Sequence, residues 1–339
     1  MPTLKDVASL AGVSIAAVSL YANGKSQGRV SPETQRKIAQ AIEETGYVIA
    51  DHKVHENSAE PRTTKTIAIF WSIDFKRNLL GACMGGIQTA IVESGLADED
   101  YDFIIRPYES DQLYKQKRYL CSRQYHAALI FNLSMMDMQY LQSIVPQIPI
   151  VLINRLMKQY HCVFIDSAKI GDQAAELIHE KGYSSLCTVG YQSSRYLAIN
   201  SRHTEFINAC RTKKIEIPNE FQLYTDNSIE GGIAAAKEYL SYSNRPNMIF
   251  AATDSIAFGI AKHFHEAGIR IPEDCGLFCY GFERAELTEY AIPPISSIDI
   301  STFRLGKSGM ELILEILNKG ISMPQHIDFP CSISLRDSF

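Results

Sequence analysis

Residue types that could bind a metal or catalyse a reaction are scattered through this sequence of 339 residues. Three small groups stand out: His52, His55 and Glu56; His263, His265 and Glu266; and the pair Cys275 and Cys279. None has the spacing of a known zinc or redox motif. The P-loop and the H-E-x-x-H motif do not occur in the sequence. The first group reads as a solvated linker rather than a metal site. We therefore expect neither an enzyme nor a protein with a bound metal or cofactor.

The first 47 residues carry the start and stop signals of three short helices, expected at 4–11, 15–21 and 32–46. Thr3 with Asp6 forms a capping box at the first start, and Pro32 opens the third helix. Ala8, Gly12 and Val18 lie at the offsets of a helix-turn-helix, with glycine in the turn. The spacing alone fits a DNA-binding unit and a plain three-helix bundle about equally well.

The composition places the chain among ordinary globular proteins. Hydrophobic residues make up 46% and charged residues 21%, and 33 Lys and Arg against 38 Asp and Glu give a net charge of −5. This balance excludes a generally polybasic protein but not a small DNA-binding module. Without a membrane-length apolar run or a secretory signal, we expect a cytoplasmic protein with no membrane partner. The eight cysteines then read as reduced thiols.

From Ile67 onward, short apolar runs alternate with amphipathic stretches, which predicts parallel sheets flanked by helices. The expected strands are 66–72, 101–108, 127–132, 149–154, 162–166, 185–191, 221–225, 247–252 and 275–282. So many strands favour two α/β lobes over a single sheet. Ligands of such folds bind at the carboxyl ends of the strands, and two facing lobes form a cleft.

The residue types of the first 47 residues identify a protein family more specifically than their spacing does. LKDVASLAGVSIAAVS, then Tyr21-Ala22-Asn23-Gly24, then VSPETQRKI closely resemble the DNA-binding headpiece of the LacI/GalR family of bacterial repressors. Asn154-Arg155, the stretch AATDSIAFGIAKHFHEAGIRIPED and the closing Ser334-Leu335-Arg336-Asp337-Ser338 extend the resemblance over essentially the whole chain. The family implies a helix-turn-helix headpiece (1–48), a linker (49–65) and a core like periplasmic sugar-binding proteins (66–339). The expected first lobe is about 66–165 and 297–323, and the second is about 166–296 and 324–339.

The resemblance also implies which headpiece residues touch DNA. The base-reading positions correspond to Ile15, Ala16 and Leu20, which are apolar and can only pack against thymine methyls or exclude other bases. The remaining expected contacts, mostly to phosphates, are Leu4, Ser14, Ser19, Asn23, Lys25, Arg29, Ser31 and Thr34. Residues 1–48 carry five basic and four acidic side chains, a net of only +1, so a dimer is needed to multiply the phosphate contacts.

The linker departs from the family pattern, in which a hinge helix wedges a leucine into the minor groove. Ile49 stands at the usual proline, Ala50 at the asparagine, Lys53 at the alanine and Glu56 at the leucine. A carboxylate cannot serve as an apolar wedge. Either the hinge contacts are lost, or DNA is bound without that kink.

By the family pattern, a small-molecule effector binds between the lobes. Arg202 is the strongest candidate, because its planar fork suits hydroxyls and carboxylates. The other expected effector residues are Trp71, Asp74, Asn154, Asn227, Asp254, Phe282 and Glu283. Trp71 stacks on a sugar ring or packs at the lobe edge, Asp254 binds ligand or caps a helix, and Asn227 stands where an aromatic often stacks.

These features predict a transcriptional regulator, most simply a repressor, that binds a near-palindromic operator as a homodimer and responds to a sugar or sugar derivative. Two alternatives stay open. One is a sugar-binding receptor with a vestigial headpiece, and the other is a regulator controlled by a protein partner.

Overall fold

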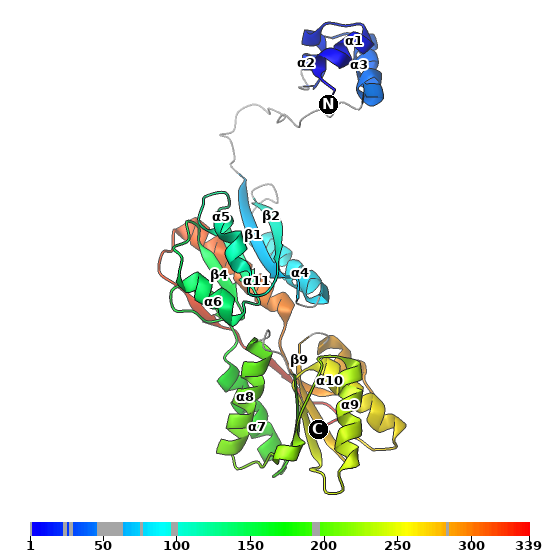
Figure 1. The fold of residues 1–339 in the computed structure, drawn as a ribbon, viewed down its shortest axis with the longest axis vertical. Helices are drawn as coiled ribbons and strands as arrows, with labels where there is room; N and C mark the ends of the chain where they lie inside the picture. Colours follow the sequence, from blue (N-terminus) through cyan, green and yellow to red (C-terminus); the bar gives the residue numbers. More distant parts are fainter. Residues whose placement is uncertain are drawn as a thin grey trace. The chain divides into compact units, whose positions relative to one another are not determined.

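A computed structural model describes residues 2–22, 26, 30–45, 64–74, 77–95, 101–191, 197–282 and 285–339. The chain divides into two compact units, Met1–Arg62 and Thr63–Phe339. We call the first the headpiece and the second the core. The headpiece is helical, and the core is built from two α/β lobes (Figure 1). The predicted fold class is therefore confirmed.

Three helices form the headpiece: α1 (Leu4–Ala11), α2 (Ile15–Ala22) and α3 (Pro32–Thr45). The predicted capping box is present, since the Thr3 hydroxyl accepts from the Asp6 N–H and the Asp6 carboxylate accepts from the Thr3 N–H at 2.7 Å. Gly12 ends α1 with φ 64°, a left-handed conformation that glycine adopts without a Cβ penalty. The chain turns by 112° between α1 and α2, within the range of helix-turn-helix motifs.

The buried side chains of Val7, Val18 and Ile38, one from each helix, hold the headpiece together. Within the described parts of the chain, no single helix is long and apolar enough to cross a membrane. Only α1 and α2 taken together, as a bent pair, satisfy the criteria of length and composition.

The first lobe contains a sheet in the order β11-β5-β4-β3-β1-β2, with every neighbouring pair parallel. Its strands are β1 (Lys65–Ser72), β2 (Tyr101–Tyr108), β3 (Ala127–Phe131), β4 (Ile150–Ile153), β5 (His161–Phe164) and β11 (His326–Asp328). The helices are α4 (Arg77–Glu93), α5 (Lys117–Leu120), α6 (Met135–Gln142) and α11 (Thr302–Lys319), with a 3-10 turn η2 at Leu113–Gln116. Helices α4 and α11 approach closely at Gly86, where a Cβ would lie 1.9 Å from the Phe303 carbonyl oxygen.

The second lobe contains a sheet in the order β12-β10-β9-β8-β6-β7, parallel except for the pairing of β12 with β10. Its strands are β6 (Cys187–Tyr191), β7 (Gln222–Thr225), β8 (Met248–Ala251), β9 (Gly276–Gly281), β10 (Ser296–Asp299) and β12 (Ser332–Ser334). Helices α7 (Ser167–Glu180), α8 (Leu197–Thr212), α9 (Ile229–Ser241) and α10 (Asp254–Glu266) flank it, with 3-10 turns η3 (Asn219–Phe221) and η4 (Ala285–Tyr290).

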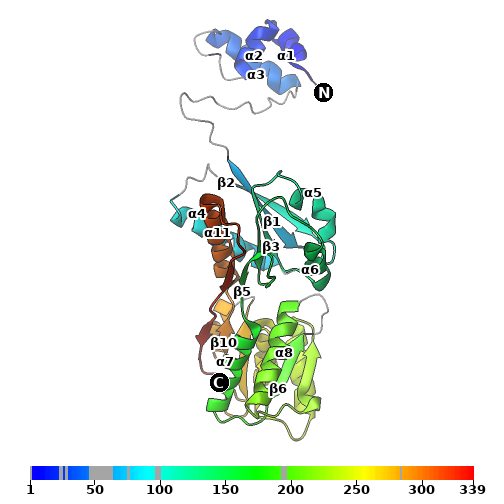
Figure 2. The same ribbon diagram turned by 90° about the vertical axis from the view of Figure 1, so that its left-hand side faces the viewer.

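The chain passes between the two sheets three times: after β5, after β10 and between β11 and β12 (Figure 2). The expected lobe boundaries differ from the sheets at two of these passages. Residues from 297 onward were expected in the first lobe, but Ser297 pairs with Cys279 in the second sheet. Residues from 324 onward were expected in the second lobe, but β11 pairs with β5 in the first sheet. β11 is a three-residue strand at the edge of the first sheet, and β10 is a four-residue strand that lies between β9 and the edge strand β12.

Candidate DNA-binding and effector-binding sites

The start of α2 presents the expected base-reading side chains. Ser14 caps the helix, because its hydroxyl accepts from the Ala17 N–H at 3.2 Å. Ile15 is 50% exposed and Ala16 is also exposed, while Leu20 is half-buried and packs against the headpiece core. Helix α2 contains no charged residue. Its exposed face can therefore contact bases only through apolar groups and hydroxyls.

Two hydroxyl groups that were expected to contact phosphates, those of Ser31 and Thr34, lie at the start of α3. The Ser31 hydroxyl accepts from the Thr34 N–H at 3.2 Å and lies 2.9 Å from the Thr34 hydroxyl. Leu4 and Ser19 are half-buried. Asn23, Lys25, Arg29 and the hinge positions Ile49, Ala50, Lys53 and Glu56 lie outside the described residues.

In the core, Asn154 and Arg202 meet between the lobes. Asn154 follows β4 with φ 62°, a conformation that asparagine tolerates better than most residues, and its N–H donates to the Val163 carbonyl at 2.7 Å. Arg202 comes from α8 of the second lobe. Its Nη2 donates to Asn154 Oδ1 at 2.6 Å. The predicted effector residues of the two lobes are thus joined directly.

Two buried guanidinium groups occupy this region. Arg202 is 2% exposed and Arg155 is 8% exposed. Arg155 is held by the backbone, since its Nε donates to the Leu133 carbonyl at 2.8 Å and its Nη1 to the Asn154 carbonyl at 2.6 Å. Burial, with repulsion from Arg202, lowers the pKa of Arg155 to about 10, and burial also lowers the pKa of Arg202. Among the described residues, Arg202 Nε has no hydrogen-bond partner.

The predicted residues of the second lobe lie at the carboxyl ends of β7, β8 and β9. The Thr253 hydroxyl donates to Asn227 Oδ1 at 2.6 Å. Asp254 is fully buried, and its Oδ2 accepts from the Phe282 N–H at 3.0 Å, which ties the end of β8 to the end of β9. The Arg202 Cζ lies 5.7 Å from the centroid of the Phe282 ring. Glu283 lies outside the described residues.

Two predicted residues of the first lobe have structural contacts. Trp71 is 4% exposed and packs against Phe131 with ring centroids 5.2 Å apart. It is therefore part of the buried hydrophobic cluster. Asp74 Oδ2 accepts from the Ser110 N–H at 3.0 Å and so fixes the loop after β2. Asn154 and Arg202 meet each other, whereas Trp71 contributes to packing.

His203, next to Arg202 on α8, was not predicted from the sequence. It is 4% exposed and its ring meets Tyr224 edge to face at 5.9 Å between centroids. Neither ring nitrogen has a partner among the described residues, and burial lowers its pKa to about 4. No sequence pattern identifies a buried, unpaired histidine, because its burial depends on the residues that pack around it in the fold.

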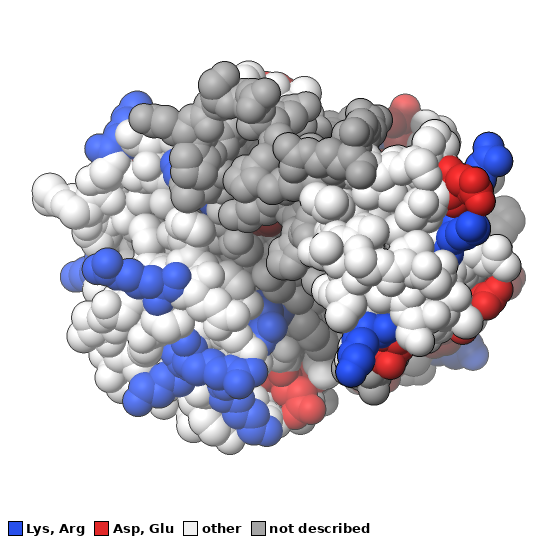
Figure 3. Space-filling view, turned by 90° about the horizontal axis from the view of Figure 1, so that it is seen from above, with Lys and Arg blue, Asp and Glu red and all other residues white. Residues whose placement is uncertain are grey.

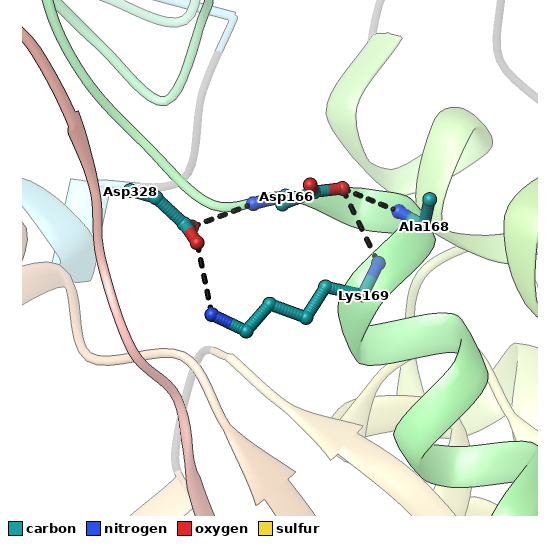
Figure 4. Close-up of polar contacts among 4 residues, drawn as sticks. All are labelled: Asp166, Ala168, Lys169 and Asp328. Atoms are coloured by element: carbon teal, nitrogen blue, oxygen red, sulfur yellow. Dashed lines mark hydrogen bonds and ion pairs between the residues drawn. The ribbon is translucent and has the colours of Figure 1, made fainter.

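A polar cluster joins two of the passages between the lobes (Figure 4). Asp328 Oδ2 accepts from Lys169 Nζ at 3.0 Å, and Asp328 Oδ1 accepts from the Asp166 N–H at 3.3 Å. Asp166 Oδ1 in turn caps α7 by accepting from the Ala168 and Lys169 N–H groups at 2.9 and 3.2 Å. A cavity of about 280 Å³ beside this cluster is lined by Asn154, Arg155, Leu156, Phe164, Ile165, Asp166, Ser167 and Ser201. The described residues include no group of three or more His, Cys, Asp or Glu placed to hold a metal ion.

The fold and these sites define a class: a helix-turn-helix DNA-binding regulator with a two-lobed core. Residues 3–49 match the model of the bacterial regulatory proteins of the lacI family, and residues 167–339 match the periplasmic binding protein-like domain. The chain belongs to the LacI family and is a DNA-binding transcriptional regulator.

Similar proteins cover nearly the whole chain. The HTH-type transcriptional repressor PurR of Vibrio vulnificus is 26% identical over 324 residues, which are 93% of this chain and 92% of PurR. The crystal structure of a LacI family transcription regulator from Clostridium acetobutylicum has a TM-score of 0.74 and 31% identity, and the match covers 80% of this chain and 100% of that one. The structure of a CelR–cellobiose complex has a TM-score of 0.66 and 23% identity over 100% of both chains.

Proposed function

We propose that the protein is a cytoplasmic, homodimeric repressor whose affinity for a near-palindromic operator is set by a sugar or sugar derivative bound between the core lobes. The observation that carries this proposal is the contact between Arg202 and Asn154, which brings buried polar groups of both lobes together. A ligand that occupies this place contacts both lobes at once. It therefore favours one arrangement of the lobes over others.

The chemistry of the site supports a ligand rich in oxygen. A guanidinium fork binds hydroxyl and carboxylate oxygens with defined geometry, and the Phe282 ring offers an apolar surface beside it. The buried Asp254 carboxylate holds the neighbouring backbone in place. A related regulator, CelR, has a structure solved as a complex with cellobiose.

Exposed apolar side chains on the second lobe support dimer formation. Tyr290 is 76% exposed and Ile292 is 80% exposed. Tyr290 ends η4 and Ile292 comes two residues later. Ile292 also lines a cavity of about 540 Å³ with Ile269, Ile271 and Pro293. Large apolar side chains exposed this close together favour a protein partner, and a second copy provides the same surface.

A binding experiment on matched variants tests the effector site. Titration calorimetry with cellobiose, ribose, a sugar acid and a sugar phosphate identifies a ligand of the full-length protein. Arg202→Lys, which loses the planar fork, is then expected to weaken binding of that ligand by roughly 10- to 150-fold. Arg211→Lys is the control, because Arg211 is exposed on the same helix. Equal affinities for the two variants would place the effector elsewhere.

Selection of bound duplexes from a random DNA pool tests operator binding. An enriched palindrome supports the dimeric regulator. A required C·G step at its centre indicates a kink, whereas a free centre indicates that the wedge is absent. If no sequence is enriched while a sugar still binds, the receptor with a vestigial headpiece replaces this proposal.

A further inference from the structure

Five basic side chains lie close together in sequence on the first lobe. They are Arg106 on β2, Lys115 in η2, Lys117 and Arg118 on α5, and Arg123 in the turn that follows. We call these five residues the basic patch. Arg106 is half-buried and the other four are exposed.

Two of the guanidinium groups share one tyrosine. The Arg106 Cζ lies 3.6 Å and the Arg118 Cζ 4.5 Å from the centroid of the Tyr119 ring, so the two carbons are no more than about 8 Å apart. Arg118 also donates to the Tyr119 hydroxyl. Tyr119 is 7% exposed and stacks on Tyr125 with centroids 5.7 Å apart. Desolvation raises the pKa of Tyr119, but the hydrogen bonds from Arg118 and Arg106 outweigh it and lower the pKa overall. The two positive charges are therefore held on a rigid aromatic support.

The members of the basic patch form no ion pairs with carboxylates of the described residues, although Glu109 and Asp111 lie between Arg106 and Lys115 in the sequence. Elsewhere in the core, several basic side chains form ion pairs with Asp or Glu, namely Lys169, Lys213, Lys262, Arg270, Lys307 and Lys319. Within the described ranges, no Asp or Glu forms an ion pair with any member of the patch. In the left part of Figure 3, Lys and Arg side chains gather with few Asp or Glu among them, whereas both kinds of charge occur in the right part. Such a surface attracts a polyanion.

One member of the basic patch, Arg123, lies near the end of the core at which β1 begins, and Arg106 lies further along β2, beside Phe70. The His126 N–H donates to the Thr66 carbonyl at 2.8 Å, and the Thr66 N–H donates to His126 Nδ1 at 2.9 Å. These bonds fix the segment that carries Arg123 against the start of β1, the first core strand after the linker. In Figure 1, α5 and β2 are labelled at this same end of the core.

The headpiece by itself is poorly supplied with positive charge. Helix α2 contains no charged residue, and residues 1–48 have a net charge of only +1. The 18 residues between Thr45 and Thr64 cannot span more than about 65 Å, so the core stays tethered near any duplex that the headpiece binds. Phosphate contacts that the headpiece lacks can be made by the core.

We propose that the basic patch is a second DNA-binding surface, which contacts the phosphodiester backbone of the duplex beside the operator without reading its sequence. This inference rests on the DNA binding of the headpiece. It assigns the first lobe a direct part in affinity and in salt dependence.

The test compares full-length variants on two duplexes of arbitrary sequence, one of about 20 and one of about 50 base pairs. The patch variant is Lys117→Gln/Arg118→Gln/Arg123→Gln. The control variant, Lys158→Gln/Arg211→Gln/Lys237→Gln, removes the same charge from exposed positions elsewhere in the core. Loss of about three phosphate contacts reduces the slope of log K against log salt by about 2.7 on the long duplex. The fall in affinity between about 50 and 200 mM salt then becomes roughly 40-fold smaller.

These outcomes test the second DNA-binding surface independently of operator recognition. A slope reduced in the patch variant but not in the control supports it, even if no operator is ever found, because the duplexes have no specific sequence. Equal slopes in wild type, patch variant and control overturn it. Unchanged DNA binding together with lost regulation in cells also overturns it, and would assign the basic patch to an acidic protein partner.

Discussion

His203 is expected to make the stability of the core depend on pH. Its imidazole is buried, has no hydrogen-bond partner among the described residues, and has a pKa lowered to about 4 by desolvation, against 6.5 for the ordinary side chain. Below pH 6.5 the unfolded chain therefore binds a proton that the folded chain rejects. The free energy of unfolding falls as the pH falls from about 6.5 to 4. Between pH 7 and pH 5 the loss from this one group is about 2 kcal/mol.

Replacement by phenylalanine isolates this contribution. His203→Phe keeps an aromatic ring edge to face with Tyr224 and removes the titrating group. Urea unfolding followed by circular dichroism gives the free energy of unfolding at each pH. The variant should gain about 2 kcal/mol relative to wild type when the pH is lowered from 7 to 5. His179→Phe, at an exposed position on α7, is the control and should show no such gain. If the difference between His203→Phe and wild type is the same at both pH values, the imidazole is not a buried neutral group.

Three further predictions concern packing, assembly and DNA reading. Gly259→Ala places a Cβ 2.1 Å from the Ile229 carbonyl oxygen and should lower the free energy of unfolding by about 3 kcal/mol or more. Gly12→Ala meets no atom within 4 Å and should lower it by only about 1 kcal/mol, because alanine is strained in the left-handed conformation. Thermal unfolding measures the difference between the two variants. Ile292→Glu should convert the proposed dimer to a monomer in sedimentation experiments, and a mass equal to that of the wild-type assembly would place the interface elsewhere. Ile15→Asn adds an amide that can read adenine, so duplex selection should shift at one position of each half-site by about 1–3 kcal/mol.

The headpiece was predictable because its signals are local. Thr3, Asp6, Gly12 and Pro32 each act on the turn in which they stand, and the structure confirms the capping box and the left-handed glycine. The nine apolar runs likewise correspond to β1–β9, with ends shifted by at most a few residues. Seven of these strands are recognisable because burial on both faces requires a continuous apolar run, whereas the edge strands β2 and β7 are partly exposed.

Features that depend on distant partners were not predictable. Strands β11 and β12 have three residues each and are largely exposed, so no hydrophobic pattern marks them, and they exist only because a sheet edge accepts them. Trp71 was given two interpretations, and its contact with Phe131 from β3 could not be read from β1 alone. The pairing of Arg106 with Arg118 on Tyr119 was also invisible, because it depends on how α5 lies against β2.

In the proposed effector site, the bond between Arg202 and Asn154 joins the two lobes. A ligand oxygen that takes the Arg202 Nη2 hydrogen now donated to Asn154 replaces an existing contact, so its net gain is the difference between two hydrogen bonds. A ligand oxygen that takes Nε, which has no partner among the described residues, adds a bond and leaves the contact with Asn154 in place. The second mode stabilises the arrangement seen here, and the first releases it. Because a ligand shifts an equilibrium only by its differential affinity for the two states, the direction of the response depends on whether the effector takes the hydrogen that binds Asn154. We expect ligands that differ in one hydroxyl group to have opposite effects on operator binding.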